Sequence, residues 1–257
     1  QRDQLLIWWP DAPWYRNEAY TTAWRGAELS ELAARGEEPE LLLEHAELAI
    51  GFLESLSSQE RAAELALACA AHCEPEEAFA WRHRAARLWI DAGEAEQAEE
   101  LLRELIDEPG ERGAELQTEL WIQLTQTLRL RDQEREARAA LSWAHTYLDE
   151  DGPPVLRARV AAQAARLHLD AEEAPEARAK AEAGLELLKG AGRLERAGHA
   201  QRAELLVLLG RGAAQEEEFN EASQMLKAAL AIQEREGLQE AAAQSLILLG
   251  KVAFAAG

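Results

Sequence analysis

Two sets of small residues recur along this chain in one common phase, and they constrain its fold more than any other feature. The first set consists of alanines spaced 35 to 45 residues apart: Ala63, Ala98, Ala137, Ala177 and Ala222. The second set lies 12 residues earlier in each repeat: Gly51, Ala86, Thr125, Ala165, Gly210 and Gly250. Because two helices approach closely only where small side chains meet, the two sets predict a series of repeated helix hairpins.

One repeat illustrates the predicted hairpin. Trp121, Leu124 and Leu128 form an apolar stripe at helical spacing, and residues 137–144 repeat such a stripe after a short polar turn at residues 131–133. A single hairpin cannot bury its own stripe and needs neighbours of the same kind. The fold class predicted is therefore all-α, an α-solenoid of antiparallel helix hairpins.

Several positions resemble the signature of the tetratricopeptide repeat (TPR). Leu-Gly pairs occur at residues 209–210 and 249–250, Trp121 and Trp89 match aromatic positions, and Pro75 matches the terminal proline. The resemblance covers about residues 44–257 and implies a right-handed superhelix. The repeats exceed the usual 34 residues and are more similar to those of kinesin light chains and of the sensor arms of MalT-like regulatory ATPases. HEAT and armadillo repeats have comparable lengths but fit the Leu-Gly and Ala phasing less well.

The predicted organisation is an N-terminal cap followed by the repeat array. The array comprises repeats at about 44–78, 79–117, 118–157, 158–202 and 203–242, with a half-repeat at 243–257. Residues 1–43 combine a degenerate repeat helix with an aromatic opening that includes Trp8, Trp9, Trp14 and Tyr15. These aromatics are expected to cover the end of the first repeat, or alternatively to form a second docking surface.

Charge and composition exclude several classes of partner. The formal net charge of −21 argues against nucleic acid and anionic membranes as partners. The apolar runs are too short to span a bilayer. Only two cysteines occur, which fits a reducing compartment, and a cytoplasmic location is expected. The excess of Arg over Lys indicates a GC-rich bacterial source, and the start at Gln1 suggests a piece of a longer protein.

The TPR resemblance implies that the first helix of each repeat lines a concave groove that binds peptides. The groove position follows each small residue of the second set and is occupied by Phe52, Arg87, Gln126, Arg166, Arg211 and Lys251. The same helical phasing also places His83 and Arg129 on the groove face. Since guanidinium groups pair with carboxylates, an acidic peptide segment is the predicted ligand. The alternative is that these arginines pair with glutamates of adjacent helices and bind nothing.

Other chemistry has little support in the sequence. Cys69, His72 and Cys73 share one helical face and would supply three zinc ligands, but no second ligand cluster accompanies them, so no metal is predicted. No nucleophile elbow, Walker loop or dinucleotide fingerprint occurs, and neither catalysis nor a cofactor is expected.

The function predicted is a protein-interaction module that binds a peptide or partner domain along the first-helix face. The main alternative is the sensing arm of a larger signalling protein, such as a MalT-like ATPase or a kinase. A weaker alternative is a solenoid attached to a peptidase.

Overall fold

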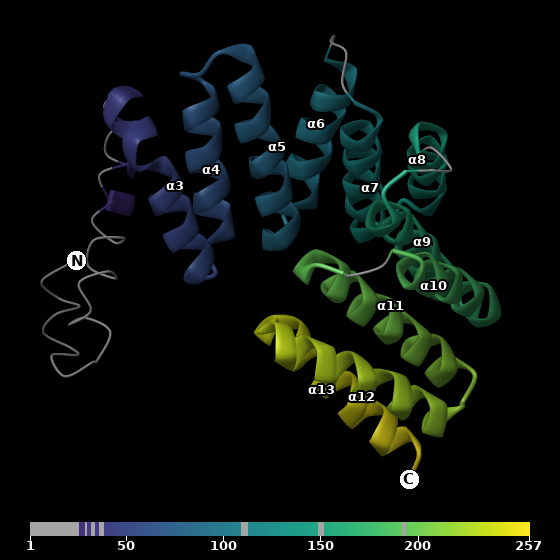
Figure 1. The fold of residues 1–257 in the computed structure, drawn as a ribbon. Helices are drawn as coiled ribbons and strands as arrows, with labels where there is room; N and C mark the ends of the chain where they lie inside the picture. Colours follow the sequence, from purple (N-terminus) through teal and green to yellow (C-terminus); the bar gives the residue numbers. More distant parts are fainter. Residues whose placement is uncertain are drawn as a thin grey trace, which may run out of the picture. The chain divides into compact units, whose positions relative to one another are not determined.

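The computed structural model describes residues 26–28, 30–31, 34–35, 39–108, 113–148, 152–191 and 194–257, which are helical apart from short connections and contain no strand. Contacts within the chain divide it into two compact units, residues 1–108 and residues 109–257 (Figure 1). Trp8, Trp9, Trp14 and Tyr15 lie outside the described residues.

Each unit is a series of antiparallel helix hairpins. The N-terminal unit contains α3 (Pro39–Ser55), α4 (Gln59–Ala70), α5 (Pro75–Ala92) and α6 (Ala95–Asp107). The C-terminal unit contains α7 (Ala114–Leu130), α8 (Glu134–Tyr147), α9 (Pro154–Asp170), α10 (Ala174–Lys189), α11 (Arg196–Gln215), α12 (Phe219–Glu236) and α13 (Gln239–Ala255). The first helices of the hairpins are α3, α5, α7, α9 and α11, and α13 stands where a further first helix would. The described helices confirm the predicted all-α solenoid.

A repeated turn closes each hairpin. Its central residue has a left-handed backbone, with φ between 54° and 85°, at Ser57, Gly93, Asp132, Glu172 and Glu217. The following amide then donates to the carbonyl five residues earlier at 2.8–2.9 Å, as in Ser58 N to Leu53 O and Glu218 N to Ala213 O. These bonds are those of the Schellman motif, which usually uses glycine. Here only one of the five turns does.

The turns define the register of the hairpins and shift the first one by a residue. Counting back seven residues from each turn residue gives Ile50, Ala86, Thr125, Ala165 and Gly210. Counting forward five gives Ala62, Ala98, Ala137, Ala177 and Ala222. All ten are buried. The predicted markers Gly51 and Ala63 are therefore each one residue too late, because the first interval is 36 residues rather than 35.

The hairpin interface explains why four of these five first-helix residues, all except Ile50, are small. A Cβ placed on Gly210 of α11 would lie 2.8 Å from Leu226 Cγ and 3.2 Å from the Ala222 carbonyl oxygen of α12. Thr125 is the one polar residue among these five, and its hydroxyl donates to the Trp121 carbonyl at 2.8 Å. Close packing of α11 on α12 thus requires glycine at this one site.

Candidate functional site

Ion pairs connect successive first helices of the C-terminal unit. Arg129 on α7 contacts Asp170 on α9 at 3.0 Å. Arg159 on α9 reaches back to Glu119 on α7, with a hydrogen bond of 2.7 Å from Nη2 to Oε1. Arg166 on α9 contacts Glu204 on α11 at 2.8 Å. Arg129 and Arg166, two of the predicted groove residues, therefore have carboxylate partners on neighbouring helices.

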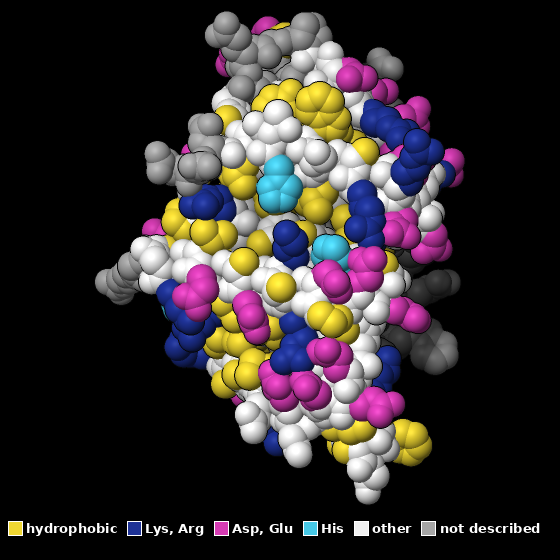
Figure 2. All heavy atoms as spheres, turned by 90° about the vertical axis from the view of Figure 1, so that its right-hand side faces the viewer, with side chains coloured by type: hydrophobic (Ala, Val, Ile, Leu, Met, Phe, Trp, Pro, Cys, Tyr) yellow, Lys and Arg dark blue, Asp and Glu magenta, His cyan; other side chains and the backbone are white. Residues whose placement is uncertain are grey.

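The second helices carry similar pairs. Arg178 of α10 contacts Glu216, Glu218 and Glu221 of the α11–α12 turn region at 2.5–2.7 Å. These contacts, led by the hydrogen bond to Glu216, raise the pKa of the Arg178 guanidinium. Figure 2 shows the same mixing, with Lys and Arg side chains beside Asp and Glu side chains over much of the face drawn. Three glutamates near the α11–α12 turn thus surround one basic side chain.

Arg211 of α11 differs from these paired arginines. Among the described residues it has no ion pair within 4.0 Å and no hydrogen bond. Burial lowers the pKa of its guanidinium; Asp170 opposes this shift, and the charges of Arg129 and Arg166 add to it. Three arginines from three successive first helices thus act on one another electrostatically near a single aspartate, which already pairs with Arg129.

A hollow of about 280 Å³ lies beside Arg211 and is called the arginine pocket below. It is formed by α11, α12 and α13, and its walls include Arg211, Phe219, Leu226, Leu248, Lys251 and Val252. Lys251 is exposed. Two cations in the wall of a mostly apolar hollow suit a carboxylate on a partly apolar ligand.

A larger hollow of about 530 Å³ adjoins it along α11 and is called the amide pocket below. It is formed by α9, α11, α12 and α13, and its walls include Arg159, Arg166, Gln201, Glu204, Gln233 and Ser245. Leu248 lines both pockets. Gln201, Gln233 and Ser245 are not among the residues predicted from the sequence. In the sequence, each of these three residues is a polar side chain on a helical stripe whose other positions are apolar or small.

The remaining predicted groove residues have varied surroundings. Phe52 is 7% exposed because the register of the first hairpin is shifted, and Gly51 takes the exposed position. Arg87 is exposed, 4.0 Å from Glu54. His83 lies against Phe79, with ring centroids 6.3 Å apart. Gln126 of α7 is half-buried. The arginine pocket and the amide pocket are both lined by residues of the C-terminal unit.

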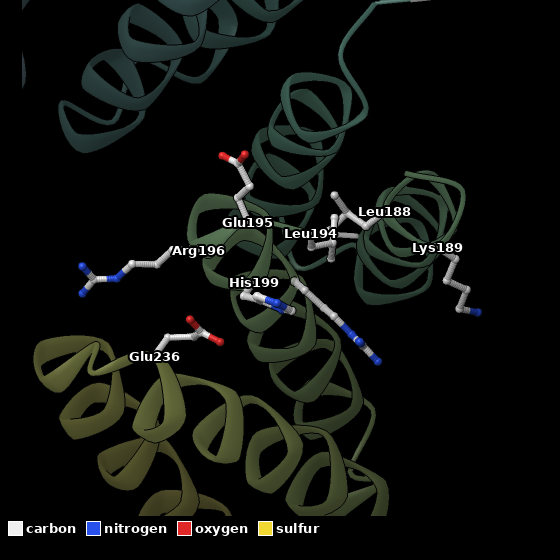
Figure 3. A pocket seen from close by; sticks show the side chains of 8 residues that line it. Leu188, Lys189, Leu194, Glu195, Arg196, His199 and Glu236 are labelled. Carbon is white, nitrogen blue, oxygen red and sulfur yellow. The ribbon is translucent and has the colours of Figure 1, made fainter. Parts of the chain in front are cut away.

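Two further surface features lie in the C-terminal unit. A hollow of about 940 Å³ lies between the ends of α10, α11 and α12. Leu188 and Leu194 lie together on one side of it, Glu195, Arg196 and Glu236 lie on the other, and Lys189 extends away (Figure 3). The outer face of α13 exposes Leu246, Ile247 and Phe254, the last to 91%.

The two cysteines of the predicted cluster are free thiols. Cys69 is buried, Cys73 is half-buried and His72 is exposed. Within the described ranges, no group of three His, Cys, Asp or Glu side chains is placed to hold a metal ion. Burial, followed by the charges of Cys73 and Glu47, raises the pKa of the Cys69 thiol to about 12. This thiol is therefore protonated at neutral pH.

Cys69 should react with iodoacetamide at pH 8 about a thousandfold more slowly in the native chain than in the unfolded chain. Only the thiolate reacts, and a pKa near 12 leaves very little of it. Mass spectrometry of the native and urea-unfolded protein measures both rates. Cys73 serves as the internal control and should be modified first, since it is less buried. Equal rates for Cys69 in the two states would contradict this prediction.

Comparisons with known proteins identify the fold. No family model matches the sequence, and no curated protein matches it. BtubC (BKLC) from P. vanneervenii has a similar structure, with a TM-score of 0.61 and 16% identity over 88% of this chain and 93% of that one. The apo form of RapI gives a TM-score of 0.52 and 12% identity over 91% of this chain, which spans 60% of RapI. A Podosopora anserina protein described as kinesin light chain with nearly identical TPR-like repeats gives a TM-score of 0.46 and 19% identity. The match covers 86% of this chain and 98% of that one.

One further property of the chain follows from its helices. No helix in the described ranges is both long and apolar enough to cross a membrane. The hairpins, their repeated turns and the similar solved structures together assign the chain to one architecture. It has the fold of a TPR-like α-solenoid.

Proposed function

We propose that this chain is a non-enzymatic interaction module whose C-terminal unit binds an acidic peptide segment along α11 and α13. The observation that carries the proposal is Arg211, a partly desolvated cation with no ion-pair partner among the described residues. The predicted groove residues Arg129 and Arg166 act as neighbouring positive charge rather than as the primary contacts, because each already has a carboxylate partner.

The electrostatics of Arg211 favour a carboxylate ligand. Its lowered pKa means that burial makes the charged form less favourable than it is in water. A carboxylate bound to the guanidinium restores that lost stabilisation and forms charge-assisted hydrogen bonds. Asp170 cannot fully serve this role, because it is shared with Arg129 at 3.0 Å. A peptide carboxylate beside Arg211 would also lie in the pocket that Lys251 lines.

The pocket walls favour a peptide over a free small anion. Phe219 and Leu248, which are half-buried, supply apolar surface in the same pocket as the two cations. Apolar pockets with a few fixed polar groups are typical of sites that take an organic ligand. A glutamate or aspartate side chain, with the peptide backbone along α11 and α13, uses both kinds of surface.

The double variant Arg211→Glu with Lys251→Glu should weaken binding of glutamate-containing peptides about a hundredfold, because it replaces attraction by repulsion at the site. The probe is a library of eleven-residue peptides, one sequence per bead, with glutamate at the central position and all other positions randomised among residues other than Asp and Glu. A second library with central alanine measures binding that does not depend on the carboxylate. Fluorescence of bound, labelled protein gives the affinities.

The matched control is Arg135→Glu with Lys227→Glu, which makes the same change in net charge on exposed positions of α8 and α12. This control should bind the glutamate library within about twofold of the unaltered chain. Equal loss in both double variants would show that only overall charge matters. Equal retention of the glutamate and alanine libraries by the unaltered chain would likewise overturn the proposed function.

A reducing, cytoplasmic location is part of the same proposal. Cys69 and Cys73 are free thiols. Free, partly exposed cysteines such as Cys73 persist where thiols are kept reduced.

A further inference from the structure

Three polar side chains from three helices line the amide pocket without hydrogen-bond partners. They are Gln201 on α11, Gln233 on α12 and Ser245 on α13, and they are 5%, 3% and 1% exposed. The atoms concerned are Gln201 Nε2, Gln233 Oε1 and Ser245 Oγ, and none has a partner among the described residues. Buried polar side chains are nearly always hydrogen bonded. Three exceptions on the wall of one hollow therefore point to a polar ligand.

The charged groups around the pocket argue against an ionic ligand there. Arg166 pairs with Glu204 at 2.8 Å, and Arg159 pairs with Glu119 at 2.7 Å. An incoming carboxylate would have to displace one of these partners, and an incoming cation would have to displace an arginine. The polar cluster that remains is uncharged, so the complementary ligand group is uncharged as well.

A primary carboxamide matches this cluster. It offers one carbonyl acceptor and two N–H donors. Gln201 Nε2, Gln233 Oε1 and Ser245 Oγ are shielded from solvent in the ligand-free chain. These side chains therefore turn toward the hollow when Gln201 Nε2 donates to the ligand carbonyl and when Gln233 Oε1 and Ser245 Oγ accept from its N–H groups. A glutamine amide can turn by 180° and exchange its donor and acceptor, and a carboxamide fits either arrangement. An alkyl side chain would leave all three groups unpaired, and a site built for hydrogen bonds rejects such a ligand strongly.

The positions of the two pockets set the spacing within a bound peptide. Gln201 and Arg211 are ten residues apart on α11, about 15 Å along the helix axis, and Ser245 and Lys251 are six apart on α13, about 9 Å. An extended peptide advances about 3.3 Å per residue. Groups held in the two pockets are therefore about three to five residues apart in the peptide.

We infer that the amide pocket selects an asparagine or glutamine side chain of the peptide, three to five residues from the acidic residue held by Arg211. This inference rests on the proposed function and adds a second specificity position to it. The volume of about 530 Å³ accommodates such a side chain together with adjoining peptide backbone.

The glutamate-centred peptide library tests this inference directly. The peptides retained by the unaltered chain should be enriched about tenfold in asparagine or glutamine at three to five positions from the central glutamate, on one side of it. Retention that depends on glutamate but shows no such enrichment would overturn the amide selection and leave the proposed function standing. Absence of any glutamate-dependent retention would overturn both.

The double variant Gln201→Leu with Gln233→Leu should abolish the enrichment and bind amide-containing peptides about tenfold more weakly. Its matched control is Gln163→Leu, because Gln163 on α9 is also buried with an unpartnered Oε1 but lines neither pocket. All these replacements remove an unpaired buried polar group, so the melting temperature should stay equal or rise by about 2–4 °C. Enrichment that survives in the double variant, or is lost in the control as well, would contradict the assignment.

Discussion

Replacing Leu226 by alanine should lower the free energy of unfolding of the C-terminal hairpins by about 3 kcal/mol. Leu226 is 1% exposed and belongs to the core cluster of α11, α12 and α13, with Ala213, Ala222 and Val252. Its partners include two alanines, which cannot move to fill the space of an isobutyl group. The loss combines reduced apolar burial with the cost of the cavity.

In a repeat array each hairpin contacts mainly its neighbours, so the effect of Leu226→Ala should remain local. Hydrogen exchange of the backbone amides in α11 to α13 measures it, and amides of α3 to α6 should be unchanged. The matched control is Leu246→Ala on α13, since Leu246 is 54% exposed. That variant should change stability by no more than about 0.5 kcal/mol. Equal effects of the two variants would contradict the assigned packing.

Replacing Gly210 by leucine should lower the free energy of unfolding by about 2 kcal/mol. A Cβ at this position already lies 2.8 Å from Leu226 Cγ, and a full side chain forces α11 and α12 apart. The higher helix propensity of leucine, worth about 1 kcal/mol over glycine, offsets part of the cost. Gly250 of α13, where nothing lies within 4 Å of an added Cβ, is the matched control and should gain stability with the same replacement.

The two core variants should compensate each other. Leu226→Ala removes the side chain that a leucine at position 210 would meet, so the double variant restores the packed volume at the α11–α12 contact. A double-mutant cycle measured by thermal unfolding should give a favourable coupling of about 1–3 kcal/mol. Strict additivity of the two losses would show that positions 210 and 226 do not share one interface.

The hairpin architecture was predictable because it depends on local patterns. Apolar residues at helical spacing, such as Leu124 and Leu128, and small residues at close contacts repeat along the chain. The register of the first hairpin was not predictable to the residue. The first interval between turn residues is 36 residues rather than the predicted 35, so Phe52 lies in the core and Gly51 faces solvent.

The candidate site was predictable only in part. Arg211 and Lys251 followed from the repeat phase, and both line the arginine pocket. Pairing of groove arginines with carboxylates of adjacent helices was the alternative drawn from the sequence. The particular partner of Arg129 was not predicted, because Asp170 lies 41 residues away on another helix. The amide cluster combines α11, α12 and α13, and its residues share no spacing that a sequence pattern would reveal.

The sequence by itself determined the helices, their pairing into hairpins and the small residues at their interfaces, because each of these depends on spacing within a few turns of helix. Only the tertiary structure decided which charged and polar groups found partners. Ion pairing and hydrogen bonding are set at distances of about 3 Å between helices some 40 residues apart. That long-range geometry gives Arg166 an ion-pair partner but leaves Arg211 without one among the described residues, although both occupy the same position of the repeat.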